Sequence, residues 1–293
     1  MSKKHPIIAV TGSSGAGTST VKEAFEHMFR REGVSPAVIE GDSFHRFNRA
    51  EMKARVAEEE AKGNACFSHF GANANEFEKL AVLFESYGKT GSGKRRLYLH
   101  SDEEAKPYDG LSPGEFTPWE DIPAGSDLMF YEGLHGCVVN DGIDMATHID
   151  LKIGVVPVIN LEWIQKIHRD TEQRGYSEEA VMDTILRRMN DYVHYIVPQF
   201  KHTDINFQRI ATVDTSDPII ARDIPTPDES MVVIRFRKPE EIAGGVDFPN
   251  LLRMIPHSFM SRRNTIVVPG GKMGFAMELI LTPILHQMLE ARG

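Results

Sequence analysis

A glycine- and serine-rich turn stands between an apolar run and an amphipathic run near the start of the chain. The turn reads Gly12-Ser13-Ser14-Gly15-Ala16-Gly17-Thr18-Ser19. Residues 7–11 before it have strand character, and residues 20–31 after it repeat apolar side chains with helical spacing. Glycines at such a junction let backbone N–H groups point at phosphate oxygens, and the helix N-terminus adds a favourable dipole. The order strand, turn, helix therefore predicts a phosphate-binding loop and makes an ordinary glycine-rich turn the weaker interpretation.

This loop predicts ligands for ATP and for a metal. The predicted ATP-binding residues are Gly12, Ser13, Ser14, Gly15, Ala16, Gly17, Thr18, Ser19 and Thr20. The hydroxyl of Ser19 occupies the position that contacts Mg²⁺ in phosphate-binding loops. Thr18 stands where such loops normally have lysine. Either another Lys or Arg supplies the missing positive charge over the phosphates, or the site is not catalytic.

Strand-like and helix-like segments alternate along the rest of the 293-residue chain, which predicts an α/β sheet. We expect one domain, residues 1–293, with residues 94–123 as a loop-rich insertion. The expected further strands are residues 37–40, 127–131, 149–156, 231–236 and 265–268, with a hairpin arm at 95–100. The expected further helices are residues 50–62, 77–87, 160–172, 178–190 and 275–290.

Charge and hydropathy restrict the partners and the location. The formal net charge of −9 is only mildly acidic and gives no reason to expect a nucleic-acid or membrane partner. No apolar run reaches the roughly 18 residues that span a membrane, and no signal peptide is visible, so we expect a cytoplasmic protein. Cys66 and Cys137 are expected to be reduced thiols. A phosphorylated substrate would need a local basic cluster.

Two carboxylates follow predicted strands. Asp42 comes after residues 37–40, and Glu132 comes directly after residues 127–131. Ligands of open α/β sheets bind at the carboxyl ends of the strands. Asp42 there can accept the proton of an attacking hydroxyl, and Glu132 can hold Mg²⁺ directly or through water. The alternative for each is a helix cap or a turn residue.

Basic side chains lie close to Asp42 in the sequence. His45, Arg46 and Arg49 follow it, and the spacing of His45 and Arg49 fits one turn of a helix. Such a pair can bind a phosphate on the acceptor substrate. The alternative is a solvated basic helix face.

A second basic segment, residues 166–175, is called the lid segment. Lys166, Arg169 and Asp170 share a helix face by their spacing, and Gly175 is expected to end the helix. Arg187 and Arg188 lie on the next predicted helix. An exposed charged helix pair is the alternative, but this segment is the best source of the charge that Thr18 lacks. We predict that Lys166 supplies it.

Several segments resemble the phosphoribulokinase family. The family signature is resembled by one continuous run, Lys166-Ile167-His168-Arg169-Asp170-Thr171-Glu172-Gln173-Arg174-Gly175-Tyr176-Ser177-Glu178-Glu179. The loop with Thr18, Gly41-Asp42-Ser43-Phe44-His45-Arg46 and Tyr131-Glu132-Gly133-Leu134-His135 are similar to the same family. The resemblance implies a P-loop nucleoside-triphosphate hydrolase fold of the nucleoside-monophosphate-kinase type, a mixed sheet with helices on both faces.

The resemblance also implies the reaction and the site. The γ-phosphate of ATP is transferred, with Mg²⁺, to the 1-hydroxyl of D-ribulose 5-phosphate, giving the ribulose 1,5-bisphosphate of Calvin cycle carbon fixation. It implies Asp42 as the base, Glu132 at the metal, and Lys166 and Arg169 at the phosphoryl group. The implied residues toward ribulose 5-phosphate are His45, Arg49 and Arg174. Asp170 is implied as a second acid, near either the base or the metal.

Regulation is implied by the bacterial branch of that family. This branch implies a homo-octamer that NADH activates and AMP inhibits, with Arg31 as a candidate effector-site residue. The phosphate loop lacks the cysteine through which thioredoxin regulates the plant branch. Two alternatives remain, a uridine-kinase-like nucleoside kinase and a non-catalytic nucleotide-binding regulator. The first needs no grip for an acceptor phosphate, and the second needs no base such as Asp42.

Overall fold

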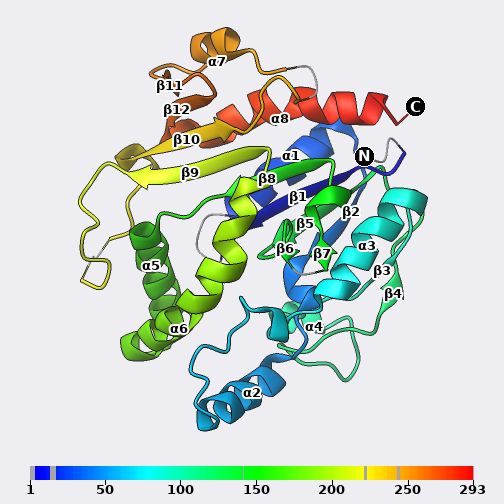
Figure 1. The fold of residues 1–293 in the computed structure, drawn as a ribbon, viewed down its shortest axis with the longest axis vertical. Helices are drawn as coiled ribbons and strands as arrows, with labels where there is room; N and C mark the ends of the chain where they lie inside the picture. Colours follow the sequence, from blue (N-terminus) through cyan, green and yellow to red (C-terminus); the bar gives the residue numbers. More distant parts are fainter. Residues whose placement is uncertain (1–3, 14–17, 141, 221–222, 243–244, 293) are drawn as a thin grey trace.

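One mixed sheet forms the centre of the protein (Figure 1). The computed structural model describes the chain except residues 1–3, 14–17, 141, 221–222, 243–244 and 293. The strand order is β11-β12-β10-β9-β8-β1-β5-β2. These strands are β1 (Ile7–Gly12), β2 (Pro36–Glu40), β5 (Leu128–Gly133), β8 (Leu151–Val155), β9 (Ile205–Ala211), β10 (Ser230–Phe236), β11 (Phe259–Arg262) and β12 (Thr265–Pro269). The five strands from β2 to β9 pair in parallel, and β10, β12 and β11 pair antiparallel, so the predicted mixed sheet is confirmed.

Helices cover both faces of the sheet, as predicted. On one face, α1 (Thr18–Glu32) and α8 (Met273–Glu290) lie side by side, with α7 (Phe248–Met254) at the antiparallel end (Figure 1). On the other face, α3 (Phe77–Thr90) packs against a second apolar cluster. Neighbouring residues of β1 divide between the clusters, with Ile8 in the first and Ile7 in the second. This alternation is what a strand buried on both faces requires.

The remaining helices lie around the carboxyl ends of the parallel strands. They are α2 (Arg49–Ala61), the short α4 (Asp102–Ala105), α5 (Ile159–His168) and α6 (Glu178–Asp191). The expected helix over residues 160–172 is confirmed, but its last part differs in type, because α5 stops at His168 and a π-helical turn, η4 (Arg169–Gln173), follows it. Gly175 then adopts a φ of 70°, a conformation that glycine reaches without strain.

The insertion forms less regular structure than expected. The predicted hairpin arm at 95–100 is wrong in length, since β3 (Lys94–Arg95) pairs over two residues with β4 (Glu120–Asp121). Beyond that pair, an isolated bridge joins Tyr98 to Phe116, and backbone hydrogen bonds link Thr117 to Leu97 at 2.9 Å and Leu99 to Glu115 at 2.9 Å. A second small hairpin joins β6 (Val139–Asn140) to β7 (Ile143–Asp144). Backbone contacts therefore join the two arms of the insertion, although the regular ladder described there covers just Lys94–Arg95 and Glu120–Asp121.

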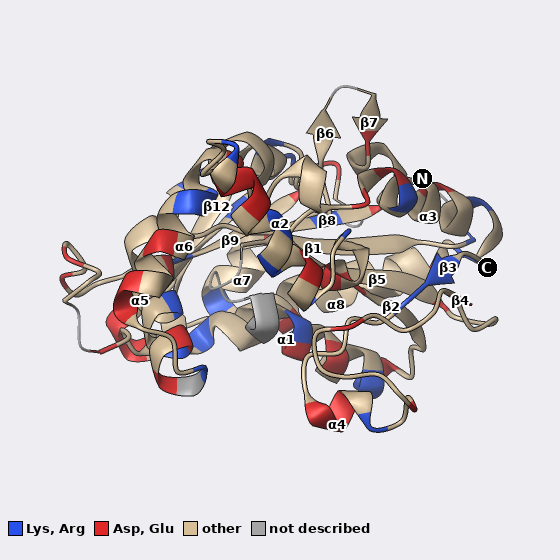
Figure 2. Ribbon diagram, turned by 90° about the horizontal axis from the view of Figure 1, so that it is seen from below, with Lys and Arg blue, Asp and Glu red and all other residues tan. Residues whose placement is uncertain are grey.

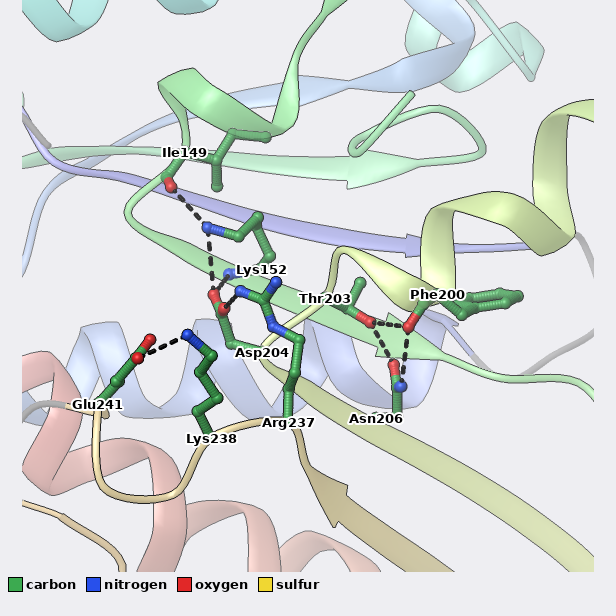
Figure 3. Close-up of polar contacts among 9 residues, drawn as sticks. All are labelled: Ile149, Lys152, Phe200, Thr203, Asp204, Asn206, Arg237, Lys238 and Glu241. Carbon is green, nitrogen blue, oxygen red and sulfur yellow. Dashed lines mark hydrogen bonds and ion pairs between the residues drawn. The ribbon is translucent and has the colours of Figure 1, made fainter. Parts of the chain in front are cut away.

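A polar cluster ties the sheet together where its strands change direction (Figure 3). The carboxylate of Asp204, just before β9, accepts a hydrogen bond from Arg237 at 2.7 Å and from the backbone N–H of Lys152 at 2.9 Å. The Nζ of Lys152 lies 3.3 Å from the same carboxylate and donates to the carbonyl of Ile149 at 3.0 Å. This cluster lies at the amino ends of β8 and β9, opposite the edge at which ligands of such sheets bind. Among the helices of the described residues, none is both long and apolar enough to cross a bilayer.

Candidate active site

A cleft of about 890 Å³ opens at the carboxyl ends of the parallel strands. Gly12 from β1, Glu132 from β5 and Asp42 after β2 line it together with Arg169 of the lid segment. The insertion supplies a further wall with Leu97, Tyr98, Leu99 and His100. The cleft thus collects residues from five separate segments of the sequence.

The predicted phosphate loop is described only at its first residues. Gly12 ends β1, and Ser13 is fully buried behind it. The predicted ligands Ser14, Gly15, Ala16 and Gly17 lie outside the described residues, as do the side chains of Thr18, Ser19 and Thr20. Since β1 ends at Gly12 and α1 begins at Thr18, the expected strand before the loop and the expected helix after it are confirmed.

Asp42 lies between two histidine side chains at the edge of the cleft. It belongs to η1 (Gly41–Phe44), a single 3₁₀ turn after β2. His45 Nε2 lies 3.6 Å from one carboxylate oxygen of Asp42, and His100 Nε2 lies 3.9 Å from the other. His100 was not predicted, because it comes from the insertion, 58 positions along the chain. An imidazole on each side restricts the directions from which a substrate hydroxyl can approach Asp42.

His45 is buried and uncharged. Burial, with electrostatic effects of the nearby His135 and Arg188, lowers the pKa of His45 to about 3. The His69 ring stacks against it with centroids 4.4 Å apart, and burial also lowers the pKa of His69. His45 can therefore offer a phosphate a hydrogen bond but not a positive charge.

The expectation that His45 and Arg49 share a helix face is wrong. His45 has extended backbone, with φ −62° and ψ 142°. The helix α2 starts only at Arg49, after Asn48, whose side chain accepts a hydrogen bond from the N–H of Glu51. Asn48 is a strong N-cap residue and fixes the start of the helix. Arg49 instead reaches the insertion, where its Nη2 donates to the carbonyl of His100 at 3.4 Å.

Asp170 gathers the cations of the lid segment. Its carboxylate accepts hydrogen bonds from Lys166, from Arg169 Nε at 3.0 Å and from Arg174 Nη1 at 3.1 Å. The expected shared face of Lys166, Arg169 and Asp170 is confirmed by these contacts. The side chains of Asp170 and Lys166 are buried, whereas Arg174 is 54% exposed. Acidic and basic residues are mixed over α5 and α6, which flank this segment (Figure 2).

Burial adjusts the charges beside Asp170. Burial and the positive charge of Arg188 lower the pKa of Lys166 to about 8, although Asp170 opposes that shift. Burial would raise the pKa of Asp170, but the hydrogen bond from Lys166 and the charge of Arg169 hold it below its usual value. Burial also lowers the pKa of Arg188 to about 10. Lys166 is therefore the cation of this group whose charge changes nearest to neutral pH.

Sequence reasoning missed a lysine in the cleft. Lys22 lies on α1, four residues after Thr18, and its Nζ donates to Glu40 Oε1 at 2.6 Å. Burial alone would lower the pKa of Lys22, but the carboxylates of Glu40 and the nearby Glu132 outweigh burial and raise it. The position of Lys22, one helical turn beyond Thr18, could have signalled that its side chain reaches the same edge of the sheet.

The carboxylates at this edge fit a magnesium ion. Mg²⁺ prefers oxygen ligands and is usually held by one or two carboxylates, substrate phosphates and waters. Glu132 lines the cleft at the end of β5, and Glu40 lies opposite it in the register of β2. The described residues contain no group of three or more side chains arranged to hold a metal by themselves. Glu40 and Glu132 are of the type that holds Mg²⁺ together with substrate phosphates.

The fold and the cleft define a P-loop phosphotransferase. Parallel strands bring a glycine-rich turn, a carboxylate and the lid cations to one place, which is the arrangement that phosphoryl transfer needs. A family model described as "Phosphoribulokinase / Uridine kinase family" matches residues 7–216. The chain belongs to this family.

The relatives that match over nearly the whole chain include several phosphoribulokinases. A phosphoribulokinase of Nitrobacter vulgaris is 62% identical over 292 residues, covering 100% of this chain and 99% of the relative. The chromosomal phosphoribulokinase of Cupriavidus necator is 63% identical over 292 residues, covering 100% and 98%. A solved phosphoribulokinase from Rhodobacter spheroides superimposes with a TM-score of 0.90 at 58% identity, over 99% of each chain.

Proposed function

We propose that this chain transfers the γ-phosphate of ATP to the 1-hydroxyl of D-ribulose 5-phosphate, giving ribulose 1,5-bisphosphate and ADP, a reaction of Calvin cycle carbon fixation. The observation that carries the proposal is the sequence identity of 62% to 63% to phosphoribulokinases over the whole chain. That similarity spans every segment that lines the cleft. The whole chain, residues 1–293, is proposed to act as one domain, which agrees with a sheet that takes strands from residue 7 to residue 269.

Asp42 is proposed to be the general base. As the 1-oxygen of the sugar attacks the γ-phosphorus, Asp42 accepts the hydroxyl proton, and the bond from the γ-phosphorus to the β–γ bridging oxygen breaks to release ADP. His45 and His100 support this role, because they flank the carboxylate while its side chain remains 39% exposed.

Lys166 and Arg169 are proposed to stabilise the charge on the phosphoryl group in flight. Fixed cations in a partly buried site are among the strongest sources of transition-state stabilisation. Glu132 and the hydroxyl of Ser19 would hold Mg²⁺, which supplies positive charge to the β- and γ-phosphate oxygens when bound. Asp170, with three cations on one carboxylate, is proposed to orient them rather than to accept a proton.

The acceptor phosphate is proposed to lie near Arg49 and Arg174. Both guanidinium groups remain partly exposed, and Arg–phosphate contacts are charge-assisted and often bidentate. His45 would add a hydrogen bond as a neutral imidazole.

The nucleoside of ATP is proposed to lie in a second cavity of about 270 Å³, which shares Gln165 with the cleft. Val158, Phe207 and the glycine pair Gly270–Gly271 line it. Flat apolar walls with backbone close by suit a purine ring.

The nearest rival is a nucleoside kinase of the same family. A coupled assay of ADP release tests the two, with ribulose 5-phosphate, with uridine and without an acceptor. We expect turnover only with ribulose 5-phosphate. Turnover with uridine alone would favour the rival, and nucleotide binding without any turnover would favour a regulator.

Regulation by NADH, assembly as a homo-octamer and a cytoplasmic location remain part of the proposal and rest on the resemblance to the bacterial branch. Arg31, the candidate effector residue, donates to Glu278 at 2.8 Å and to Thr282 at 3.0 Å on α8. An effector that binds there would have to compete with these contacts or use Arg31 together with them.

A further inference from the structure

Arg96, at the start of the insertion, holds the backbone of the segment that carries Asp42. Its Nε donates to the carbonyl of Ser43 at 2.8 Å, and its Nη2 donates to the carbonyl of His45 at 2.6 Å. The two carbonyls lie on either side of Phe44. One planar guanidinium thus fixes both ends of a three-residue stretch that follows the proposed base.

Aromatic rings fix Arg96 in turn. Its guanidinium carbon lies 3.6 Å from the ring centroid of Phe116 and 4.8 Å from that of Trp119. Trp119 packs edge-on against Phe44, with centroids 5.5 Å apart. The contacts close a ring from Arg96 through the turn and Phe44 to Trp119 and back to Arg96. Burial lowers the pKa of Arg96, but at neutral pH the guanidinium remains charged.

The turn has few internal restraints. A single 3₁₀ turn is held by weak hydrogen bonds. Its N-cap, Glu40, makes no capping hydrogen bond with its side chain, and the buried hydroxyl of Ser43 has no partner among the described residues. On its far side the carbonyl of Phe44 accepts the N–H of Glu76 at 2.8 Å. The turn is therefore held between residues 74–76 and Arg96.

Arg96 is placed to act through the turn rather than on a substrate. Its neighbours Arg95 and Leu97 line the cleft, whereas the guanidinium of Arg96 is taken up by the two carbonyls. We propose that Arg96 is a positioning residue, which aims the carboxylate of Asp42 at the acceptor hydroxyl and so makes the insertion part of the catalytic apparatus. The inference rests on the proposed role of Asp42. Lysine cannot replace Arg96, because it lacks the planar fork that reaches two carbonyls at once.

The test compares Arg96→Lys and Arg96→Met with the wild type and with a matched control, Lys94→Met. Lys94 lies on the same short strand, is exposed and pairs only with Asp121 among the contacts described for it. We expect Arg96→Lys to keep a thermal midpoint close to that of the wild type and to lose about 10- to 100-fold in kcat, the size of a misplacement by about 1 Å. KM for ATP should stay within about twofold, and Lys94→Met should behave as the wild type.

A double variant separates positioning from other roles. If Arg96 acts through Asp42, Arg96→Lys should cost little further turnover in an Asp42→Asn background, because residues that act as one unit are not additive. Full additivity, or normal kcat in Arg96→Lys, would overturn the inference. The acceptor in every assay is the one that the wild type uses. A wild type that turns over uridine would therefore reject the proposed function while leaving the Arg96 test intact.

Discussion

Glu40 and Glu132 lie directly opposite each other at the ends of β2 and β5, and Lys22 donates a hydrogen bond to Glu40. Two carboxylates that lie side by side on neighbouring strands repel each other. The 2.6 Å contact from Lys22 to Glu40 offsets that repulsion. Glu40 is thereby paired with a cation beside Glu132, the proposed metal ligand.

Replacing Lys22 should weaken nucleotide binding. In Lys22→Met, Glu40 keeps its negative charge beside the triphosphate, so we expect KM for MgATP to rise roughly tenfold, on the order of one charge-assisted hydrogen bond. Titration of the free protein with Mn²⁺ should also show tighter binding, because Glu40 loses its cation beside Glu132. The double variant Lys22→Met/Glu40→Gln should recover most of the affinity for MgATP. A double variant as weak as the single one would show that Lys22 acts on the nucleotide itself.

Asp42→Asn should reduce kcat by about 10²–10⁴-fold, the range for lost acid–base catalysis. The amide keeps the shape of the side chain, so the dissociation constants of ATP and of the acceptor should change little. Single-turnover rates and equilibrium binding measure the two effects separately. Near-normal turnover in Asp42→Asn would show that Asp42 is not the general base.

Neutral replacements of Arg49 and Arg174 should raise KM for ribulose 5-phosphate far more than KM for ATP. Each loses a charge-assisted contact to the acceptor phosphate. Arg187→Gln offers a control on the same side of the molecule, since Arg187 pairs with Glu60 at 2.5 Å on α2. A collapse of ATP affinity with unchanged KM for the sugar phosphate would move Arg49 and Arg174 to the nucleotide side.

Lys166 should set an alkaline limit on activity. Its pKa is lowered to about 8, so the charged form that we propose for catalysis is present below that pH and is lost above it. The profile of kcat/KM for ATP reports the free enzyme and should fall on the alkaline side near pH 8. Lys166→Met should cut kcat by about 10²–10³-fold. Thr18→Lys in that background should restore part of the loss, whereas full activity in Lys166→Met alone would refute the role of Lys166.

Activity should not respond to dithiol reductants but should rise with NADH. Burial raises the pKa of Cys137 to about 12, so its reactive thiolate is scarce, and Cys66 lies on the surface far along the chain from the phosphate loop. Assays with and without reductant test the first half, and a titration with NADH tests the second. A large effect of reductant contradicts the first half, and a flat NADH titration contradicts the second.

The sequence predicted the elements whose patterns are local. Strand β1, helix α1 and the position of Asp42 after β2 follow from apolar spacing and from turn residues. Strand β9 was missed, although Ile205 and Phe207 alternate with polar residues, a sign of a strand that could have been used. Asn48 likewise carried the N-cap signal that separates His45 from Arg49.

Contacts between distant segments could not be predicted in the same way. Arg96 reaches carbonyls 51 and 53 positions away, and only the packing of Phe116 and Trp119 around its guanidinium decides that geometry. The roles of the individual site residues and the single domain stay predictions. The sequence indicates which type of side chain each position contributes, whereas the contacts of that side chain depend on the fold.

The pairing of β1 has a consequence for how the protein is made. Both neighbours of β1 in the sheet, β5 and β8, come from residues more than a hundred positions later. The phosphate loop therefore leaves the ribosome long before the strands that support it exist. Contacts over such separations form slowly, since a long stretch of chain must be ordered first. A nascent chain that ends before Val155 can pair β1 with β5 but cannot complete its pairing with β8, so the cleft can assemble only after about half of the protein has been synthesised.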